Sequence, residues 1–177
     1  MAKHTIITYG HPVLRQTAKP VGKVDERIRT IIQDMMEALS EEQGIGLAAP
    51  QIGIPERIVI IDLSKSGQQT KMALLNPEII FSSKDRVPYE EGCLSIPEVW
   101  GTVYRPSSVK VKAKTTSGKS IVIEADDILA RVLQHEIDHL NGKLFIDYLS
   151  EEDRAKNAEK ISALLEENRK KLGHVAL

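Results

Sequence analysis

The segment at residues 134–142 constrains the fold of this chain most, because its sequence QHEIDHLNG contains the pattern H-E-x-x-H. Residues four apart on a helix lie about 40° apart around its axis, so His135 and His139 project from one side and can bind one metal ion. Glu136 is offset by about 100° and can reach a metal-bound water from the flank. The alternative is a surface helix that carries two histidines by chance. The histidines border an apolar helix face, where an unpaired imidazole needs a partner, and this favours the metal site.

Two histidines alone make a weak metal site, and Cys93 is the best candidate for a third ligand, because the remaining histidines stand near the termini. Cys93 lies in the segment EEGCLSIP, where Gly92 allows close backbone approach and Pro97 restricts the local conformations. A thiolate and two imidazoles suit a borderline divalent ion and leave a fourth position open for water. Two other roles stay open for Cys93: a buried small hydrophobe, or a nucleophile with a histidine base.

Composition excludes several classes of protein. The chain has 24 basic and 25 acidic residues among 177, and a formal net charge of −1 gives no overall footprint for nucleic acid or anionic lipid. No apolar run approaches the roughly 18 residues of a membrane span, and the start MAKHTIITYG lacks the pattern of a signal peptide. One cysteine cannot form an intramolecular disulfide, which favours a reducing compartment. We therefore expect a cytoplasmic protein without membrane or direct DNA binding.

Hydrophobic periodicity predicts one domain over residues 1–177 with an α+β fold. Residues 1–24 are expected to be irregular, and an amphipathic helix follows from Asp25 to near Gly44. The Gly- and Pro-rich segment 44–55 is expected to be a shaped loop. Short strands follow, antiparallel or mixed, and the last two form a hairpin; they are expected at residues 57–63, 71–75, 78–81, 108–114 and 120–124.

Two helices complete the expected fold. The first carries the H-E-x-x-H motif, can be capped by Asp126 or Asp127, and is the element around which the central strands are expected to pack. The second is a C-terminal helix over about residues 150–172, with Ser150 as its cap.

Three segments taken together resemble the signature motifs of the peptide deformylases, in the same order and at similar separations. They are GIGLAAPQ at 44–51, EGCLS at 91–95 and QHEIDH at 134–139. The resemblance covers nearly the whole chain, and its C-terminal helix is typical of the bacterial type I branch. It implies a metallohydrolase that removes the formyl group from the N-terminal methionine of newly synthesised polypeptides and releases formate.

The resemblance also implies roles for individual residues. Cys93, His135 and His139 would hold one divalent ion, in this family often Fe²⁺, with Zn²⁺, Ni²⁺ or Co²⁺ as alternatives. The ion would supply hydroxide near neutral pH, and Glu136 would take the water proton and pass it to the departing amine. The side-chain amide of Gln51 and the backbone N–H of Leu94 would stabilise the oxyanion.

A pocket for methionine needs an aliphatic lining and room for the peptide backbone. Ile45, Ile128 and Val132 are the candidates for the lining, although core packing is an equal alternative for the last two. Gly44 and Gly46 would let a peptide lie close to the loop, and Tyr89 is the candidate for the mouth. Trp100 either covers the rim of the pocket, which we favour, or stacks on a substrate residue.

The expected partners are N-formyl-Met nascent peptides. By resemblance, the C-terminal helix also predicts a weak association with the ribosome, for which the cluster Arg169, Lys170 and Lys171 is the only support, and helix-dipole compensation explains that cluster as well. Two competing functions stay open at this point: an endopeptidase that uses the same helix motif, and a non-catalytic metal-binding domain.

Overall fold

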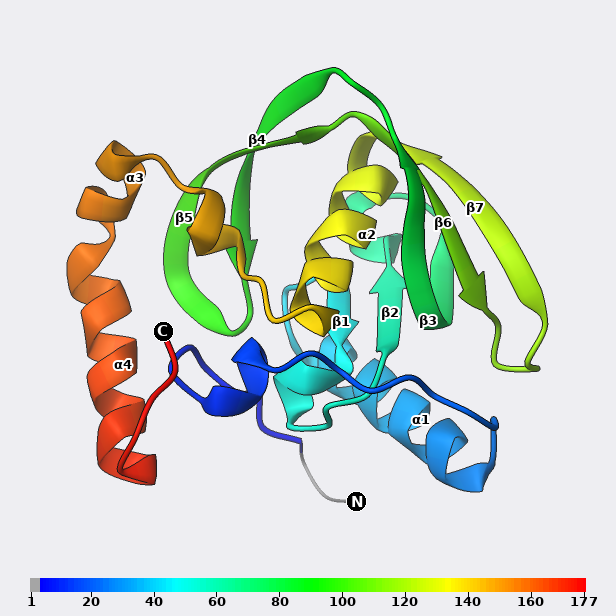
Figure 1. Cartoon of the computed structure of the whole chain (residues 1–177), viewed down its shortest axis with the longest axis horizontal. Helices are drawn as coiled ribbons and strands as arrows, with labels where there is room; N and C mark the ends of the chain where they lie inside the picture. Colours follow the sequence, from blue (N-terminus) through cyan, green and yellow to red (C-terminus); the bar gives the residue numbers. More distant parts are fainter. Residues whose placement is uncertain (1–3) are drawn as a thin grey trace.

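The computed structural model of the chain describes residues 4–177, which form an α+β fold (Figure 1). Short 3-10 helices, labelled η, join the longer elements. The elements follow in this order: η1 (Pro12–Arg15), α1 (Glu26–Glu41), β1 (Gly46–Ala48), η2 (Ala49–Ile52), β2 (Ile58–Asp62), η3 (Ser64–Ser66), β3 (Lys71–Ser82), β4 (Arg86–Cys93), β5 (Ile96–Pro106), β6 (Ser108–Lys114), β7 (Ser120–Asp126), α2 (Asp127–Leu140), η4 (Phe145–Tyr148), α3 (Glu151–Lys156) and α4 (Ala158–Leu172).

The strands form two antiparallel sheets, and α2 lies between them (Figure 1). The larger sheet has five strands in the order β1-β2-β3-β6-β7, and the smaller is the hairpin β4-β5. One face of α2 packs on the larger sheet through Leu133 and Ile137, which share a core with Val59 and Val111. The expected packing of the strands around the H-E-x-x-H helix is confirmed.

Alternation of apolar and charged residues explains the hairpin β6-β7. Val109 and Val111 are buried on β6, while the lysines that alternate with the buried residues, Lys110, Lys112 and Lys114, face solvent. Strands with this period of two bury one face and solvate the other, and a five-residue turn closes the pair. The hairpin expected from the sequence is confirmed.

Helix α1 begins where the sequence predicts. The side chain of Asp25 accepts a hydrogen bond from the backbone N–H of Ile28 and caps the helix. Its apolar face packs on β1, β2 and η2 in a second core that includes Met35, Leu47 and Ile60. The irregular start is confirmed for residues 4–24 apart from η1; residues 1–3 lie outside the described part of the chain.

Several expected boundaries were wrong. The two strands expected at 71–75 and 78–81 are one strand, β3, with an irregular register where Pro77 cannot donate and Asn76 adopts a φ of 51°. The expected loop at 44–55 contains the edge strand β1 and the turn η2. Strands β4 and β5 were not expected at all.

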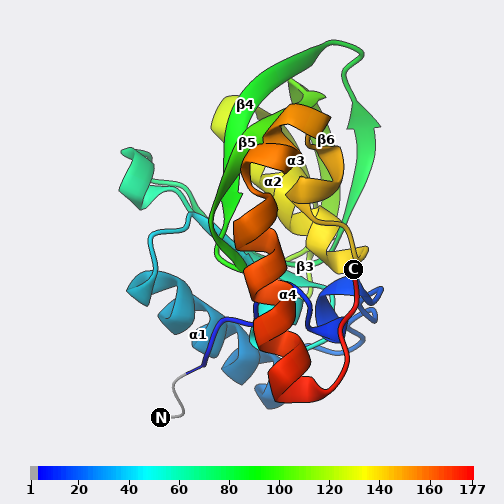
Figure 2. The ribbon, with the colours of Figure 1, turned by 90° about the vertical axis from the view of Figure 1, so that its left-hand side faces the viewer.

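The expected C-terminal helix is two helices, α3 and α4, which break at Asn157. The amide of Asn157 donates to the carbonyl oxygens of Trp100 and Asp153, and this ties the break to β5. Ser150 caps α3 as expected, accepting from the N–H of Asp153. Helix α4 lies on the outside of the molecule, against β5 and η4 (Figure 2).

Among residues 4–177, none of the helices has the length and apolar composition that crossing a membrane requires.

Candidate metal centre and cleft

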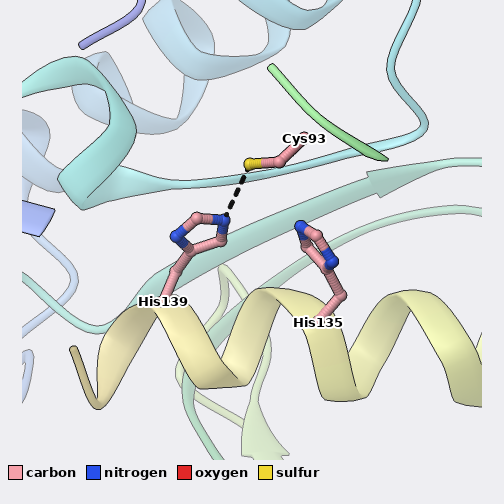
Figure 3. Close-up of side chains that lie close together, drawn as sticks. All are labelled: Cys93, His135 and His139. Atoms are coloured by element: carbon pink, nitrogen blue, oxygen red, sulfur yellow. Dashed lines mark hydrogen bonds between the residues drawn. The ribbon is translucent and has the colours of Figure 1, made fainter. Parts of the chain in front are cut away.

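Helix α2 and the end of β4 bring the three candidate ligands together. His135 and His139 project from the same side of α2 toward Cys93, as Figure 3 shows. Their ligand atoms all lie within 4.8 Å of one another, and Cys93 Sγ is 3.3 Å from His139 Nε2. The spacing of four residues therefore places His135 and His139 on one side of α2, as expected.

The donors fit a divalent metal ion. One sulfur and two imidazole nitrogens are the donor set that borderline ions such as Zn²⁺ and Fe²⁺ accept. Within the described residues, the buried Oε2 of Glu136, which lines the cleft beside Cys93 and His135, has no hydrogen-bond partner. A buried polar atom without a partner is costly, so this corner of the core suits a group besides the protein chain.

Glu91, at the buried end of β4, orients the ring of His135. Its Oε1 lies 2.8 Å from His135 Nδ1, so the other ring nitrogen faces Cys93. Burial raises the pKa of Glu91, but hydrogen bonds from His135 and Arg105 outweigh this and lower the pKa to about 2. A carboxylate that stays ionised at this position fixes which nitrogen is free for a metal.

Two arginines and a second carboxylate complete a buried charge network around Glu91. Arg105 donates to Glu91 at 2.7 and 3.1 Å and to Asp138 at 2.8 Å. Arg131 donates to Glu91 at 2.9 Å. Sequence reasoning missed all four residues, although Glu91 stands inside the EGCLS segment and Asp138 inside the H-E-x-x-H segment. Their position within those motifs was the available signal.

Burial and charge set the protonation of His135, Glu136 and His139 on α2. Burial raises the pKa of Glu136 to about 7, so this carboxyl exchanges its proton near neutrality. Burial lowers the pKa of His139 well below its ordinary value, and the charge of His135 adds to this. Burial also lowers the pKa of His135, but Cys93 and Glu91 outweigh it and raise that pKa well above 6.5. A metal ion held by the free ring nitrogen of His135 would require that nitrogen to be deprotonated.

Gln51 reaches the same site from η2. Its side chain is fully buried, and Oε1 accepts from the backbone N–H of Ala48 at 2.9 Å. This bond turns the amide Nε2 toward Ser95 Oγ at 3.1 Å and Cys93 Sγ at 3.5 Å. Leu94 follows Cys93 in the turn between β4 and β5. The amide Nε2 of Gln51 therefore faces the sulfur, and Gln51, Cys93 and Leu94 line the same cleft.

A cleft of about 510 Å³ opens onto these residues. It is lined by Cys93, His135 and Glu136, whereas His139 lies deeper in the core. All the candidates for substrate contact also line the cleft: Gly44, Ile45, Gly46, Gln51, Tyr89, Leu94, Ile128 and Val132. The six residues expected to form the methionine pocket are thus brought together.

The glycines and Trp100 shape the edges of this cleft. A Cβ on Gly46 would lie 2.8 Å from Glu136 Oε1, so the strand approaches Glu136 as closely as glycine allows. The ring of Trp100 covers Gly92, whose added Cβ would lie 2.6 Å from it, and 57% of Trp100 remains exposed. Trp100 therefore stands at the rim of the cleft, as expected.

Residues 3–155 match the sequence profile of the polypeptide deformylase family. The chain belongs to the peptide deformylase family. A peptide deformylase of Bartonella tribocorum is 46% identical over 153 residues, which span 85% of this chain and 86% of the relative. A solved peptide deformylase structure from Legionella pneumophila is 40% identical, with a TM-score of 0.85, over 94% of this chain and 98% of that one.

A peptide deformylase from Synechococcus elongatus, solved in complex with actinonin, is 38% identical, with a TM-score of 0.81, over 95% of this chain and 90% of that one. Family membership confirms the resemblance carried by the three motifs and the α+β fold. The activity of a peptide deformylase is hydrolysis of the formyl group from N-formyl-Met peptides, and the chain is accordingly an enzyme of protein biosynthesis. The family is metal-dependent, which agrees with the cysteine and histidine cluster. The endopeptidase and the non-catalytic domain are therefore not favoured.

Proposed function

We propose that Cys93, His135 and His139 hold one divalent ion, Fe²⁺ in the cell, and that Glu136 is the general acid and base of deformylation. The observation that carries the proposal is the meeting of three ligand atoms within 4.8 Å beside a buried carboxyl with one unpartnered oxygen. When bound, the ion supplies Lewis acidity that activates water and polarises the formyl oxygen. Zn²⁺, Ni²⁺ or Co²⁺ would suit the same donors.

Glu136 moves the proton. Because burial raises its pKa to about 7, the carboxyl can accept a proton from the attacking water and release it again near neutral pH. The amine of the peptide must leave protonated, and the same carboxyl delivers that proton. The close approach of Gly46 keeps the Glu136 side chain against the cleft.

Gln51 and Leu94 stabilise the oxyanion that forms as the formyl carbon becomes tetrahedral. The Oε1 atom of Gln51 accepts a hydrogen bond from the backbone N–H of Ala48, so its Nε2 is oriented before the substrate binds. A preorganised donor of this kind is worth about a hundredfold to a thousandfold in rate. The backbone N–H of Leu94 is fixed by the β4-β5 turn and supplies the second donor.

The cleft holds the N-terminal methionine of a nascent peptide. Ile45, Ile128 and Val132 give it an aliphatic lining, and Tyr89 stands at its mouth. The peptide backbone would lie along β1 beside Gly44 and Gly46, which line the cleft; the Cβ position of Gly46 is itself occupied by Glu136 and Val132.

Formate release from formyl-Met-Ala under anaerobic conditions, with metal analysis of the same sample, tests the proposal. Glu136→Gln should retain the metal and lose nearly all turnover, because the amide keeps the shape of the carboxyl without its proton transfer. Unformylated Met-Ala-Ser serves as the control, and it should stay uncleaved. Full turnover by Glu136→Gln would remove Glu136 from its role, and Zn²⁺ as the main metal in anaerobic samples would contradict Fe²⁺.

The site of action that fits this chemistry is the cytoplasm, where Cys93 stays reduced and nascent chains are available. Association with the ribosome through α4 should be weak, because the basic cluster at its end is engaged within the helix. Arg169 and Lys170 pair with Glu166, and Lys171 pairs with Glu167. Co-sedimentation with ribosomes should fall when residues 169–177 are deleted; equal co-sedimentation before and after would remove the case for this cluster.

A further inference from the structure

Arg131 on α2 is a buried arginine whose guanidinium contacts four groups of the β4-β5 hairpin. It donates to the backbone oxygens of Val87 at 2.7 Å and Val103 at 2.9 Å, and to Glu91 Oε2 at 2.9 Å. Its Cζ also lies 5.5 Å from the centre of the Tyr89 ring, within the range of a cation–π contact. Only 8% of its side chain is exposed.

These contacts fall into two groups, according to whether a second side chain binds the same acceptor. Arg105 also donates two hydrogen bonds to Glu91, so the contact of Glu91 with His135 does not depend on Arg131 alone. Within residues 4–177, no other side chain donates to the carbonyl oxygens of Val87 or Val103. Arg131 is therefore the α2 side chain that holds these two carbonyl oxygens, while Gln134 and Asp138 of α2 hold Pro106 and Arg105 farther along β5.

The two carbonyl oxygens flank Tyr89. Val103 lies directly opposite Tyr89 in the β4-β5 register, and Val87 precedes Tyr89 by two residues on β4. Both Arg131 and Tyr89 line the cleft, and 52% of Tyr89 remains exposed there. A planar guanidinium can hold two carbonyls and one ring at the same time, which the single ammonium of lysine cannot do.

We propose that Arg131 is a positioning residue for the substrate: it fixes Tyr89 and the flanking hairpin backbone as a rigid wall of the cleft. The inference rests on the proposed role of Tyr89 in holding the peptide. Loss of the guanidinium loosens this wall, and each turnover then requires the substrate to order it again. The effect falls on substrate binding, because Arg105 still orients Glu91 and through it His135.

Arg131→Met tests this role, since methionine keeps an apolar stem of similar length. We expect the KM for formyl-Met-Ala-Ser to rise about tenfold, with kcat changed by less than about threefold. The dissociation constant for Co²⁺, measured through the thiolate-to-cobalt absorption band, should also change by less than about threefold.

Arg15 offers a matched control outside the cleft, because it makes the same three kinds of contact. It donates to the carboxylate of Asp147 and the carbonyl oxygen of Gly142, and its Cζ lies 5.7 Å from the Tyr9 ring. Arg15→Met should lower the melting temperature and leave KM unchanged. An equal KM in Arg131→Met and Arg15→Met would overturn the proposal, as would a loss confined to kcat and Co²⁺ affinity.

Two further variants keep the test decisive. Arg131→Lys retains the charge at this position. Its KM should also rise. A KM equal to that of the wild type would overturn the proposal even if Arg131→Met does not fold. Tyr89→Ala tests the role of Tyr89 separately. If Tyr89→Ala leaves KM unchanged, the proposed contact of Tyr89 with substrate fails; if it raises KM while neither Arg131 variant does, only the inference about Arg131 fails.

Discussion

The two hairpins of this enzyme are attached to helix α2 by different forces. Hairpin β6-β7 belongs to the larger sheet and is anchored by apolar side chains such as Val109 and Val111, which are buried in the core under α2. Hairpin β4-β5 stands apart as a two-stranded sheet, and its attachment to α2 is a network of buried charges around Glu91. The first hairpin supports the fold, and the second carries Cys93 to the metal centre.

This difference follows from what each hairpin must do. Apolar packing is non-directional and tolerates small shifts, whereas bidentate arginine–carboxylate pairs fix distance and angle. A metal ligand and the wall of a substrate cleft must be placed at a fixed distance and angle, which such pairs provide. Pairs such as Arg105–Glu91 cost desolvation, and the network offsets this by matching two arginines with two carboxylates.

Cys93→Ser in hairpin β4-β5 is expected to reduce activity far more than a matched substitution in hairpin β6-β7. A neutral hydroxyl is a poor ligand beside two imidazoles, so metal affinity should weaken and formate release should fall by about a thousandfold or more. Ala113→Ser places the same hydroxyl in the buried face of β6 and should cost about 1–3 kcal/mol of stability without changing kcat/KM. Assays of formate and of bound metal on both variants check this; an active Cys93→Ser enzyme would remove the sulfur from the site.

The charge network also makes hairpin β4-β5 sensitive to acid. The pKa of Glu91 is about 2 in the fold against an ordinary value of 4.5, so its ionised form stabilises the fold above about pH 4.5. That contribution, about 3 kcal/mol, is lost as the pH falls from about 4.5 toward 2. Urea unfolding of the metal-free protein at several pH values should show this loss, and Glu91→Gln should flatten the dependence. An unchanged slope in Glu91→Gln would place the acid sensitivity elsewhere.

Glu91→Gln should have a smaller effect on metal affinity at neutral pH. The amide can still contact His135 and Arg105, but it no longer carries the charge that fixes the histidine ring. Loss of such a partner weakens metal binding by about tenfold to a hundredfold. Competition with a chelator measures this change directly. Glu124→Gln, an exposed carboxylate that pairs with Lys110 on β6-β7, is the control and should leave the affinity unchanged.

Elements held by local patterns could be predicted from the sequence, whereas the strand held by distant charge contacts could not. Hairpin β6-β7 and helix α1 follow from alternation, helical spacing and the Asp25 cap, all of which are local patterns. Strand β4 was missed because its sequence RVPYEEGC has exposed apolar residues and a buried glutamate, the reverse of the usual pattern. Its partner β5 was missed with it, although buried and exposed residues alternate over most of β5. Burial of Glu91 depends on arginines 14 and 40 residues away, which no local pattern reveals.

The candidate site was easier to predict than the strand that carries it. Cys93, His135 and Glu136 stand in short motifs whose spacing reflects their chemistry, and the fold brings them together as expected. The residues behind them, Arg105 and Arg131, look like ordinary surface charges in the sequence. Their roles depend on tertiary contacts with Glu91, so only the structure reveals them.

Gly118 in the turn of β6-β7 should show the smallest effect, and it tests the supporting hairpin without touching the site. Its φ of +82° lies in the left-handed region, and open space surrounds the position of a Cβ. Gly118→Ala should therefore cost about 1 kcal/mol through backbone strain alone, and Gly118→Asn should cost less because asparagine tolerates this region. Thermal unfolding measures both, and kcat/KM should stay at the wild-type value. A drop in kcat/KM would mean that the two hairpins are coupled, because a turn that does not line the cleft would then influence it.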